Sequence, residues 1–85
     1  MEQIHYYETT VTWTKDRIGE LTEPTLPNIT VATPPEFPKG VPNIWSPEHL
    51  FLASVNVCLM TTFLSIAENS KLEFIAYKGD SKAKL

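Results

Sequence analysis

Residues 46–72, SPEHLFLASVNVCLMTTFLSIAENSKL, decide the fold because they predict one long helix. Ser46 suits the N-cap position, where a side-chain oxygen accepts a bond from a backbone amide of the first turn. Pro47 suits the first helical position, whose own amide needs no partner. Glu48, at the second position, is stabilised by the positive end of the helix dipole. The sequence therefore predicts a helix that begins at Pro47 and carries the chain's only cysteine, Cys58, near its middle.

The interior of this helix is apolar on nearly all sides, and residues 50–67 include no charged side chain. Eighteen residues reach the lower limit for a membrane span, but no basic flank marks an inner end. Five polar residues interrupt the run: Ser54, Asn56, Thr61, Thr62 and Ser65. The pattern favours the buried central helix of a soluble assembly, in which a second copy of this short chain supplies cover. A membrane-associated helix is the alternative.

Strand composition precedes and follows the helix. Residues 4–14, IHYYETTVTWT, are rich in Tyr, Thr, Val and Trp, and they predict a strand that ends in a turn over residues 14–20. A second strand is expected from Ile18 to Thr22, and NITVAT, residues 28–33, predicts a third. The proline-rich residues 34–45 predict a semi-rigid loop, and LEFIAYKG, residues 72–79, predicts a further strand.

The bulk composition narrows the function classes. A chain of 85 residues, 42% hydrophobic and 20% charged, predicts a single folded domain over residues 1–85. The net charge of −3 and the lack of a basic run argue against nucleic acid as a partner. One cysteine permits no internal disulfide, and the N-terminus has no basic region followed by an apolar one. A cytoplasmic protein is therefore expected.

Cys58 has two interpretations. An apolar helix often uses a free cysteine as a small hydrophobic core residue. A reactive thiol instead needs a nearby cation, and Arg17, the only arginine, is one candidate, although alone it resembles a solvated turn residue. Glu48 could orient such an arginine by a bidentate pair. Glu48 and Cys58 lie ten residues apart, or about 15 Å along a straight helix, so they would share a site only through two antiparallel helices or a helix break.

Other chemistries find no support in the sequence. His5 and His49 show no metal-ligand spacing with Cys58. The three glycines are scattered, so no phosphate-binding loop is present, and no serine nucleophile elbow occurs. No cofactor or metal is expected.

Residues 45–74, WSPEHLFLASVNVCLMTTFLSIAENSKLEF, resemble the central helix of the osmotically induced protein C (OsmC) and organic hydroperoxide resistance (Ohr) family. Pro47-Glu48-His49-Leu50, followed by small and apolar residues and then Cys58, match the start and spacing of that helix. The upstream order also fits the family: a strand with VTW, a turn with Arg17, and the segment LPNITVATPPEF.

The resemblance implies an α+β fold in which N-terminal antiparallel strands pack on a long central helix, completed by an intertwined homodimer. It implies thiol-dependent reduction of organic hydroperoxides in oxidative-stress defence, with an external thiol or dithiol as reductant. Cys58 would be the peroxidatic thiolate. Arg17 would favour the thiolate and hold the peroxide, and Glu48 would orient Arg17.

The chain departs from the family in two respects. Typical members are longer and carry a second, resolving cysteine in the C-terminal half, which this sequence does not include. Residues 1–85 are therefore expected to be an incomplete OsmC-like domain, and a thiol peroxidase of this form would lack the intramolecular disulfide step. The alternative is a non-catalytic dimeric α+β domain in which Cys58 is a structural core residue.

Overall fold

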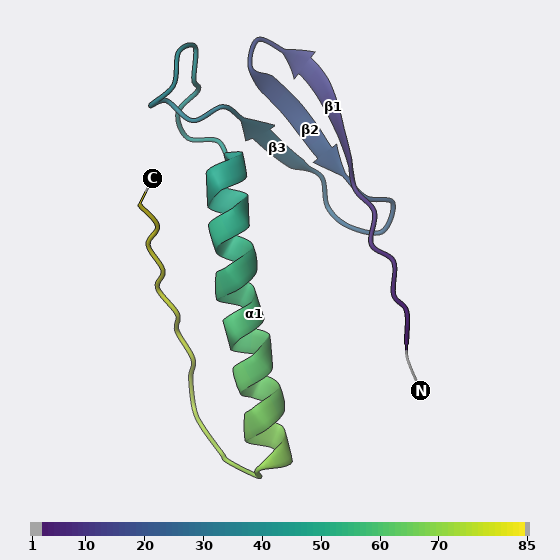
Figure 1. Cartoon of the computed structure of the whole chain (residues 1–85), viewed down its shortest axis with the longest axis vertical. Coiled ribbons are helices and arrows are strands. Elements are labelled where there is room, and N and C mark those ends of the chain that lie inside the picture. The colour runs from purple at the N-terminus through teal and green to yellow at the C-terminus, as the bar shows by residue number, and fades with distance from the viewer. Residues whose placement is uncertain (1–2, 85) are drawn as a thin grey trace. The chain divides into compact units, whose positions relative to one another are not determined.

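The protein is a small α+β chain of three antiparallel strands and one helix, seen in a computed structural model that describes residues 3–84. It divides into two compact units, residues 1–47 and 48–85. The first unit holds strands β1 (Thr10–Lys15), β2 (Ile18–Thr22) and β3 (Ile29–Ala32), and nearly all of helix α1 (Pro47–Asn69) belongs to the second (Figure 1).

The sheet of the first unit has the strand order β1-β2-β3, with both pairs antiparallel. Thr10 pairs with Thr22 at one end of the β1-β2 hairpin, and Lys15 pairs with Ile18 next to the turn. The register shifts between Trp13 and Lys15, which leaves room for a bulge. The strands β2 and β3 confirm the second and third predicted strands almost to the residue.

The first predicted strand was too long at its start. Residues 4–14 were expected to be extended in a sheet, but β1 begins only at Thr10. The partner strand explains the difference, because β2 ends at Thr22 and the chain then turns, with Leu26 N–H donating to the Glu23 carbonyl at 3.1 Å. In the described part of the chain, residues 3–9 have no strand to pair with, and Tyr6 is 86% exposed.

The proline-rich loop is irregular, as predicted, and a ladder of backbone hydrogen bonds holds it against the sheet. Ala32 N–H donates to the Trp45 carbonyl at 2.9 Å, and Val41 N–H donates to the Thr33 carbonyl at 2.8 Å. Thr33 N–H donates to the Arg17 carbonyl at 3.2 Å, which ties the loop to the β1-β2 turn. These bonds satisfy backbone groups that a loop of this composition cannot satisfy by itself.

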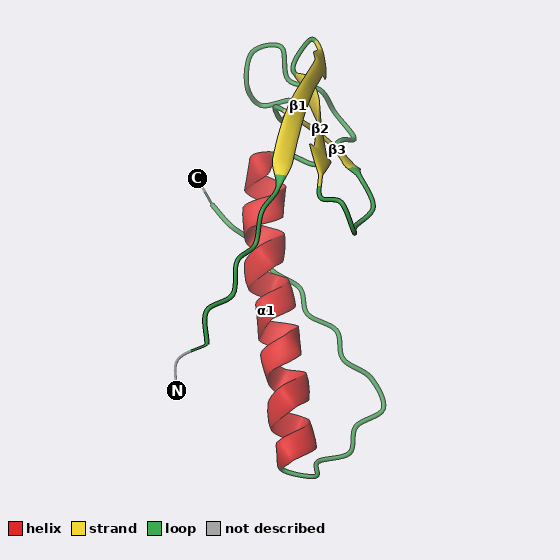
Figure 2. Ribbon diagram, turned by 90° about the vertical axis from the view of Figure 1, so that its right-hand side faces the viewer, coloured by secondary structure: helices red, strands yellow, loops and turns green. Residues whose placement is uncertain are grey.

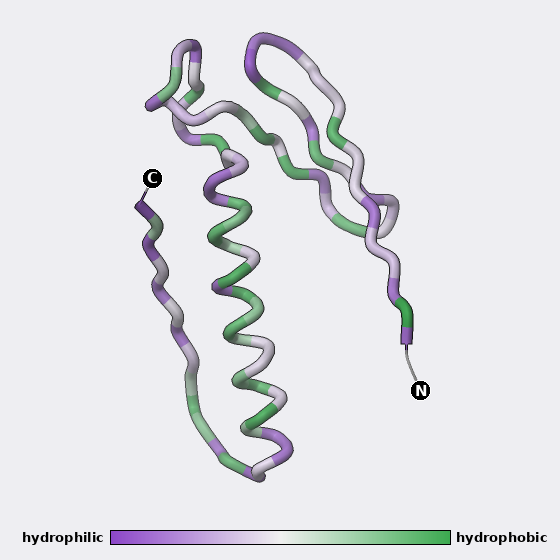
Figure 3. The backbone as a smooth tube through the Cα atoms, viewed as in Figure 1, coloured by the Kyte–Doolittle hydropathy of each residue, from purple (hydrophilic) through white to green (hydrophobic). Residues whose placement is uncertain are grey.

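Helix α1 begins at Pro47, as predicted, and continues without interruption to Asn69 (Figure 2). Ser46, directly before it, is fully buried. The hydropathy colouring shows apolar residues along almost the whole helix (Figure 3). Ala67 is its only buried residue, so most of this apolar surface lies open in the single chain.

The end of α1 is a Schellman motif, in which the chain reverses through a left-handed residue. Leu72 N–H donates to the Ala67 carbonyl at 2.8 Å, and Lys71 N–H donates to the Glu68 carbonyl at 3.1 Å. Lys71 takes the left-handed position with φ 55°. That position usually carries glycine, because a side chain there crowds the following carbonyl.

Lys71→Gly is therefore expected to stabilise the second unit by about 1 kcal/mol, since glycine adopts this φ without the steric cost. Urea unfolding followed by helical circular dichroism measures the change. An alanine at the same position keeps the steric cost and serves as the control. A Lys71→Gly midpoint at or below that of Lys71→Ala would contradict the assignment.

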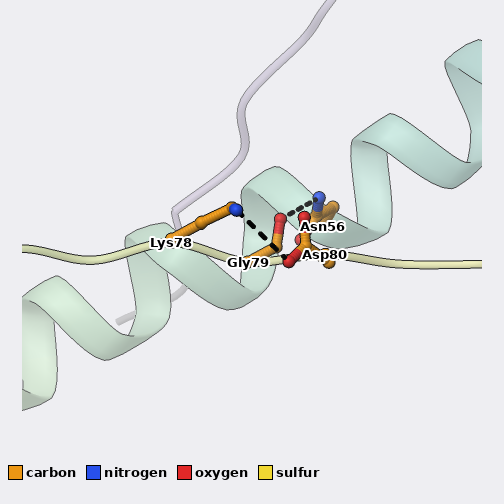
Figure 4. Close-up of polar contacts among 4 residues, drawn as sticks. All are labelled: Asn56, Lys78, Gly79 and Asp80. Carbon is orange, nitrogen blue, oxygen red and sulfur yellow. Dashed lines mark hydrogen bonds and ion pairs between the residues drawn. The ribbon is translucent and has the colours of Figure 1, made fainter.

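Residues 72–79 do not form the predicted strand. The segment is extended but returns alongside α1, where no neighbouring strand offers a ladder of hydrogen bonds. Phe63 of α1 meets Phe74 edge-on at a centroid distance of 5.0 Å and Tyr77 at 5.2 Å. The side-chain amide of Asn56 donates to the Gly79 carbonyl at 3.1 Å (Figure 4). Packing on the helix replaces the sheet pairing that the composition had suggested.

Candidate functional site

Cys58 is an exposed free cysteine at the middle of α1. It lies on one face of the helix, together with residues spaced three and four apart that we call the outer row: Phe51, Val55, Cys58 and Thr62. All four are exposed, and Phe51 is 75% accessible. The thiol is thus open to a small reactant in the single chain, with apolar side chains beside it.

A second row covers another side of α1 and explains why Cys58 is left open. This inner row consists of Asn56, Met60, Phe63 and Ala67, all buried or half-buried. Asn56, Phe63 and Ala67 each contact the returning segment 72–79 through the bonds and ring contacts described above. Among the described residues of the second unit, the segment that follows α1 packs on the inner row and leaves the outer row uncovered.

Glu48 lies in the first turn of α1 and is exposed. The helix has no break between Glu48 and Cys58, so the ten-residue separation corresponds to about 15 Å along the axis. One copy of the helix therefore does not bring the two side chains together, and of the two arrangements considered from the sequence, the helix break is absent.

Arg17 lies in the two-residue turn between β1 and β2, as predicted, and its side chain is exposed. The turn is fixed by its neighbours: Trp13 Nε1 donates to the Asp16 carbonyl at 2.9 Å, and Thr14 Oγ1 donates to the Ile18 carbonyl at 3.1 Å. Arg17 belongs to the first unit, whereas Glu48 and Cys58 belong to the second. The grouping of these three residues stays a prediction.

The structure adds a residue that the sequence analysis did not single out. Lys39, in the proline-rich loop, lines a pocket of about 530 Å³ together with Asp16, Arg17 and Val41. The sequence signal was weak, because Lys39 and Arg17 are far apart along the chain. They come together because Thr33 N–H donates to the Arg17 carbonyl and Val41 N–H, from the loop, donates to the Thr33 carbonyl.

Two further properties bear on function. Among residues 3–84, no group of three or more His, Cys, Asp or Glu side chains is placed to hold a metal ion.

By length and composition alone, α1 is apolar enough to cross a membrane. Its most apolar window has a mean hydropathy of 2.0, and 6% of that window is buried. The buried core helix of a soluble protein passes the same test of length and hydropathy.

No protein-family model matches the chain, and no curated protein matches it either.

Proposed function

We propose that this chain is an OsmC/Ohr-like protein that reduces organic hydroperoxides through the thiolate of Cys58. The observation that carries the proposal is the position of Cys58 at the middle of an unbroken helix whose sequence, from Trp45 to Leu72, resembles the peroxidatic helix of that family. A peroxidatic cysteine needs a nearby cation and a path for the peroxide, so the dimer proposed below would have to leave Cys58 accessible at the edge of the covered surface.

In the proposed reaction, Cys58 Sγ attacks the outer oxygen of the hydroperoxide. An S–O bond forms, the O–O bond breaks, and the alkoxide takes a proton from water and leaves as an alcohol. Cys58 becomes a sulfenic acid, and the peroxide is reduced by two electrons. The guanidinium of Arg17 would stabilise the thiolate and the charge that develops on the leaving oxygen.

The return of Cys58 to the thiol needs an external reductant, because the sulfenic acid is two electrons more oxidised than the thiol. Residues 1–85 include no second cysteine, so a thiol of the reductant attacks the sulfenic sulfur directly. This attack forms a mixed disulfide and releases water. A second thiol attacks the mixed disulfide, frees Cys58 and leaves the reductant oxidised. The reducing cytoplasm, where this protein is proposed to work, supplies such thiols.

A homodimer is part of the proposal. The outer row and its apolar neighbours Leu59 and Ile66, each 59% exposed, form an apolar surface on a single helix that a second copy could cover. An antiparallel arrangement of two α1 helices about a two-fold axis would place Glu48 of one protomer near Cys58 of its partner. Glu48 would then orient an arginine beside the thiol, a role that it cannot perform within one straight helix.

The test is the mass of the folded protein after a small excess of an organic hydroperoxide, with hydrogen peroxide in parallel and dimedone present to trap sulfenic acid. We expect a single dimedone adduct on Cys58 that forms faster with the organic peroxide. Cys58→Ser is expected to give no adduct, because a hydroxyl is a far weaker nucleophile than a thiolate. The fold of the variant is checked by circular dichroism.

The same experiment distinguishes the non-catalytic alternative. If Cys58 is a structural residue of a dimeric domain, the wild-type protein gives no adduct and Cys58→Ser changes only the free energy of unfolding. An unreactive wild-type protein that is folded and dimeric would refute the peroxidase proposal.

Membrane association is the second candidate, favoured by the exposed apolar surface and high hydropathy of α1. It predicts that the purified chain needs detergent and binds to lipid vesicles. A dimer in buffer without detergent, seen by light scattering, together with no vesicle binding on flotation, would dismiss it.

A further inference from the structure

The pocket formed by Arg17, Lys39, Asp16 and Val41 supports an inference that concerns the first unit alone. It shares Arg17 with the proposed peroxidase chemistry, but its test is binding to the first unit and needs neither Cys58 nor the peroxidase activity. We propose that this pocket binds the carboxylate group of a small organic monoanion.

The charges of the lining favour a monoanion. Arg17 and Lys39 contribute two positive charges and Asp16 one negative charge, so the lining carries a net charge of +1 (2 − 1). Within the first unit neither cation forms an ion pair with a carboxylate of the described residues. A guanidinium presents a planar pair of donors that matches a carboxylate, and an ammonium adds a point charge beside it. Val41, half-buried in the lining, offers contact to an aliphatic portion.

Backbone hydrogen bonds hold together the two segments that carry the cations. Thr33 N–H donates to the Arg17 carbonyl, and Val41 N–H donates to the Thr33 carbonyl, so Thr33 links the turn to the loop on which Lys39 lies. The turn is further fixed by the bond from Trp13 Nε1 to the Asp16 carbonyl. Because these backbone segments are already held together, binding a ligand between them costs only the ordering of the two side chains.

Backbone strain lies at the same place. Asp16 has φ 49° and Lys39 has φ 63°, so both adopt the left-handed region although neither is glycine. For lysine this conformation is disfavoured, and such residues often lie at binding sites. Glycine at position 39 would adopt this φ without the cost but would remove the charge.

The test is an NMR titration of the whole chain with sodium butyrate, at constant ionic strength maintained with sodium chloride. Butyrate is expected to shift the amide signals of residues 16–17 and 39–41 with a saturable curve. Inorganic phosphate serves as the comparison anion and is expected to bind more weakly, because it is largely dianionic near neutral pH and lacks an aliphatic portion. Tighter binding of phosphate than of butyrate would overturn the assignment to a carboxylate.

Three variants sharpen the test. Lys39→Gln is expected to weaken butyrate binding about threefold, the loss typical of one exposed ion pair. Lys15→Gln removes the same charge one residue before the turn, outside the pocket lining, and is expected to leave the affinity nearly unchanged. Asp16→Asn keeps a residue that tolerates the left-handed φ but removes the repelling carboxylate, so the affinity should rise two- to threefold.

The outcomes are decisive in both directions. A Lys39→Gln loss together with an Asp16→Asn gain supports the site, and the second change is not explained by misfolding. Equal losses in Lys39→Gln and Lys15→Gln would show only general attraction of anions to positive charge. That result, or the absence of saturable shifts at residues 16–17 and 39–41, would overturn the proposal.

Discussion

Replacement of Arg17 by glutamine is expected to slow the oxidation of Cys58 by an organic hydroperoxide about a hundredfold. Arg17 is the only arginine of the chain, and the proposed mechanism assigns it to the thiolate and to the peroxide oxygen. Glutamine keeps much of the side-chain length and hydrogen-bonding capacity but has no charge. Arg17→Lys should give an intermediate rate, because an ammonium keeps the charge but loses the planar pair of donors.

The measurement is the single-turnover rate of sulfenic acid formation, followed by mass spectrometry after rapid quenching. Lys15→Gln is the matched control, since it removes a positive charge two residues from Arg17 at the end of β1. Equal rates for wild-type protein and Arg17→Gln would remove Arg17 from the proposed chemistry. Equal slowing in Arg17→Gln and Lys15→Gln would assign the effect to overall charge and not to a specific contact.

The helix and the inner strands were predictable because their signals are local. Ser46 and Pro47 mark the start of α1 by their own conformational preferences, and an uninterrupted apolar run follows. Strands β2 and β3 are bounded by turn residues on both sides, so their limits follow from the sequence. In each case the preferences of the segment and its final structure agree.

The errors arose where structure depends on a distant partner. Residues 4–9 have strand composition, but β2 ends too early to pair with them. Residues 72–79 also have strand composition, yet they pack on Phe63 and Asn56 of the helix. β-propensity measures whether a side chain fits a sheet surface and says nothing of whether a neighbouring strand exists.

The candidate site divides in the same way. The sequence singled out Cys58, Arg17 and Glu48 by residue type and by a family resemblance, and the structure places them on a helix face, in a turn and at a helix start. Lys39 was missed because it comes near Arg17 only through two backbone hydrogen bonds of Thr33, one to the Arg17 carbonyl and one from Val41 N–H. Such long-range contacts leave no periodic pattern in a single sequence.

The loop that carries Lys39 also yields the largest expected effect on stability. Gly40→Ala should destabilise the first unit by about 3 kcal/mol, a value at the upper end of overpacking effects. A Cβ atom at Gly40 would overlap the Pro34 carbonyl oxygen and lie 2.7 Å from Pro35 Cα, both of them backbone atoms. Gly40 does not have a positive φ, so the objection to a side chain is steric and not conformational. The overlap could be relieved only if the backbone at residue 40 moved away from Pro34 and Pro35.

Both tryptophans, Trp13 and Trp45, lie in the first unit, so tryptophan fluorescence follows that unit while helical circular dichroism follows α1. Gly40→Ala should lower the urea midpoint seen by fluorescence. Gly79→Ala is the control, because its Cβ would meet side-chain atoms of Asn56 and Tyr77, at 2.9 and 3.2 Å, which can rotate away. A fluorescence midpoint unchanged by Gly40→Ala would mean that the loop yields without cost. The loop would then be too loosely held to position Lys39, and the argument for a preorganised carboxylate pocket would fail with it.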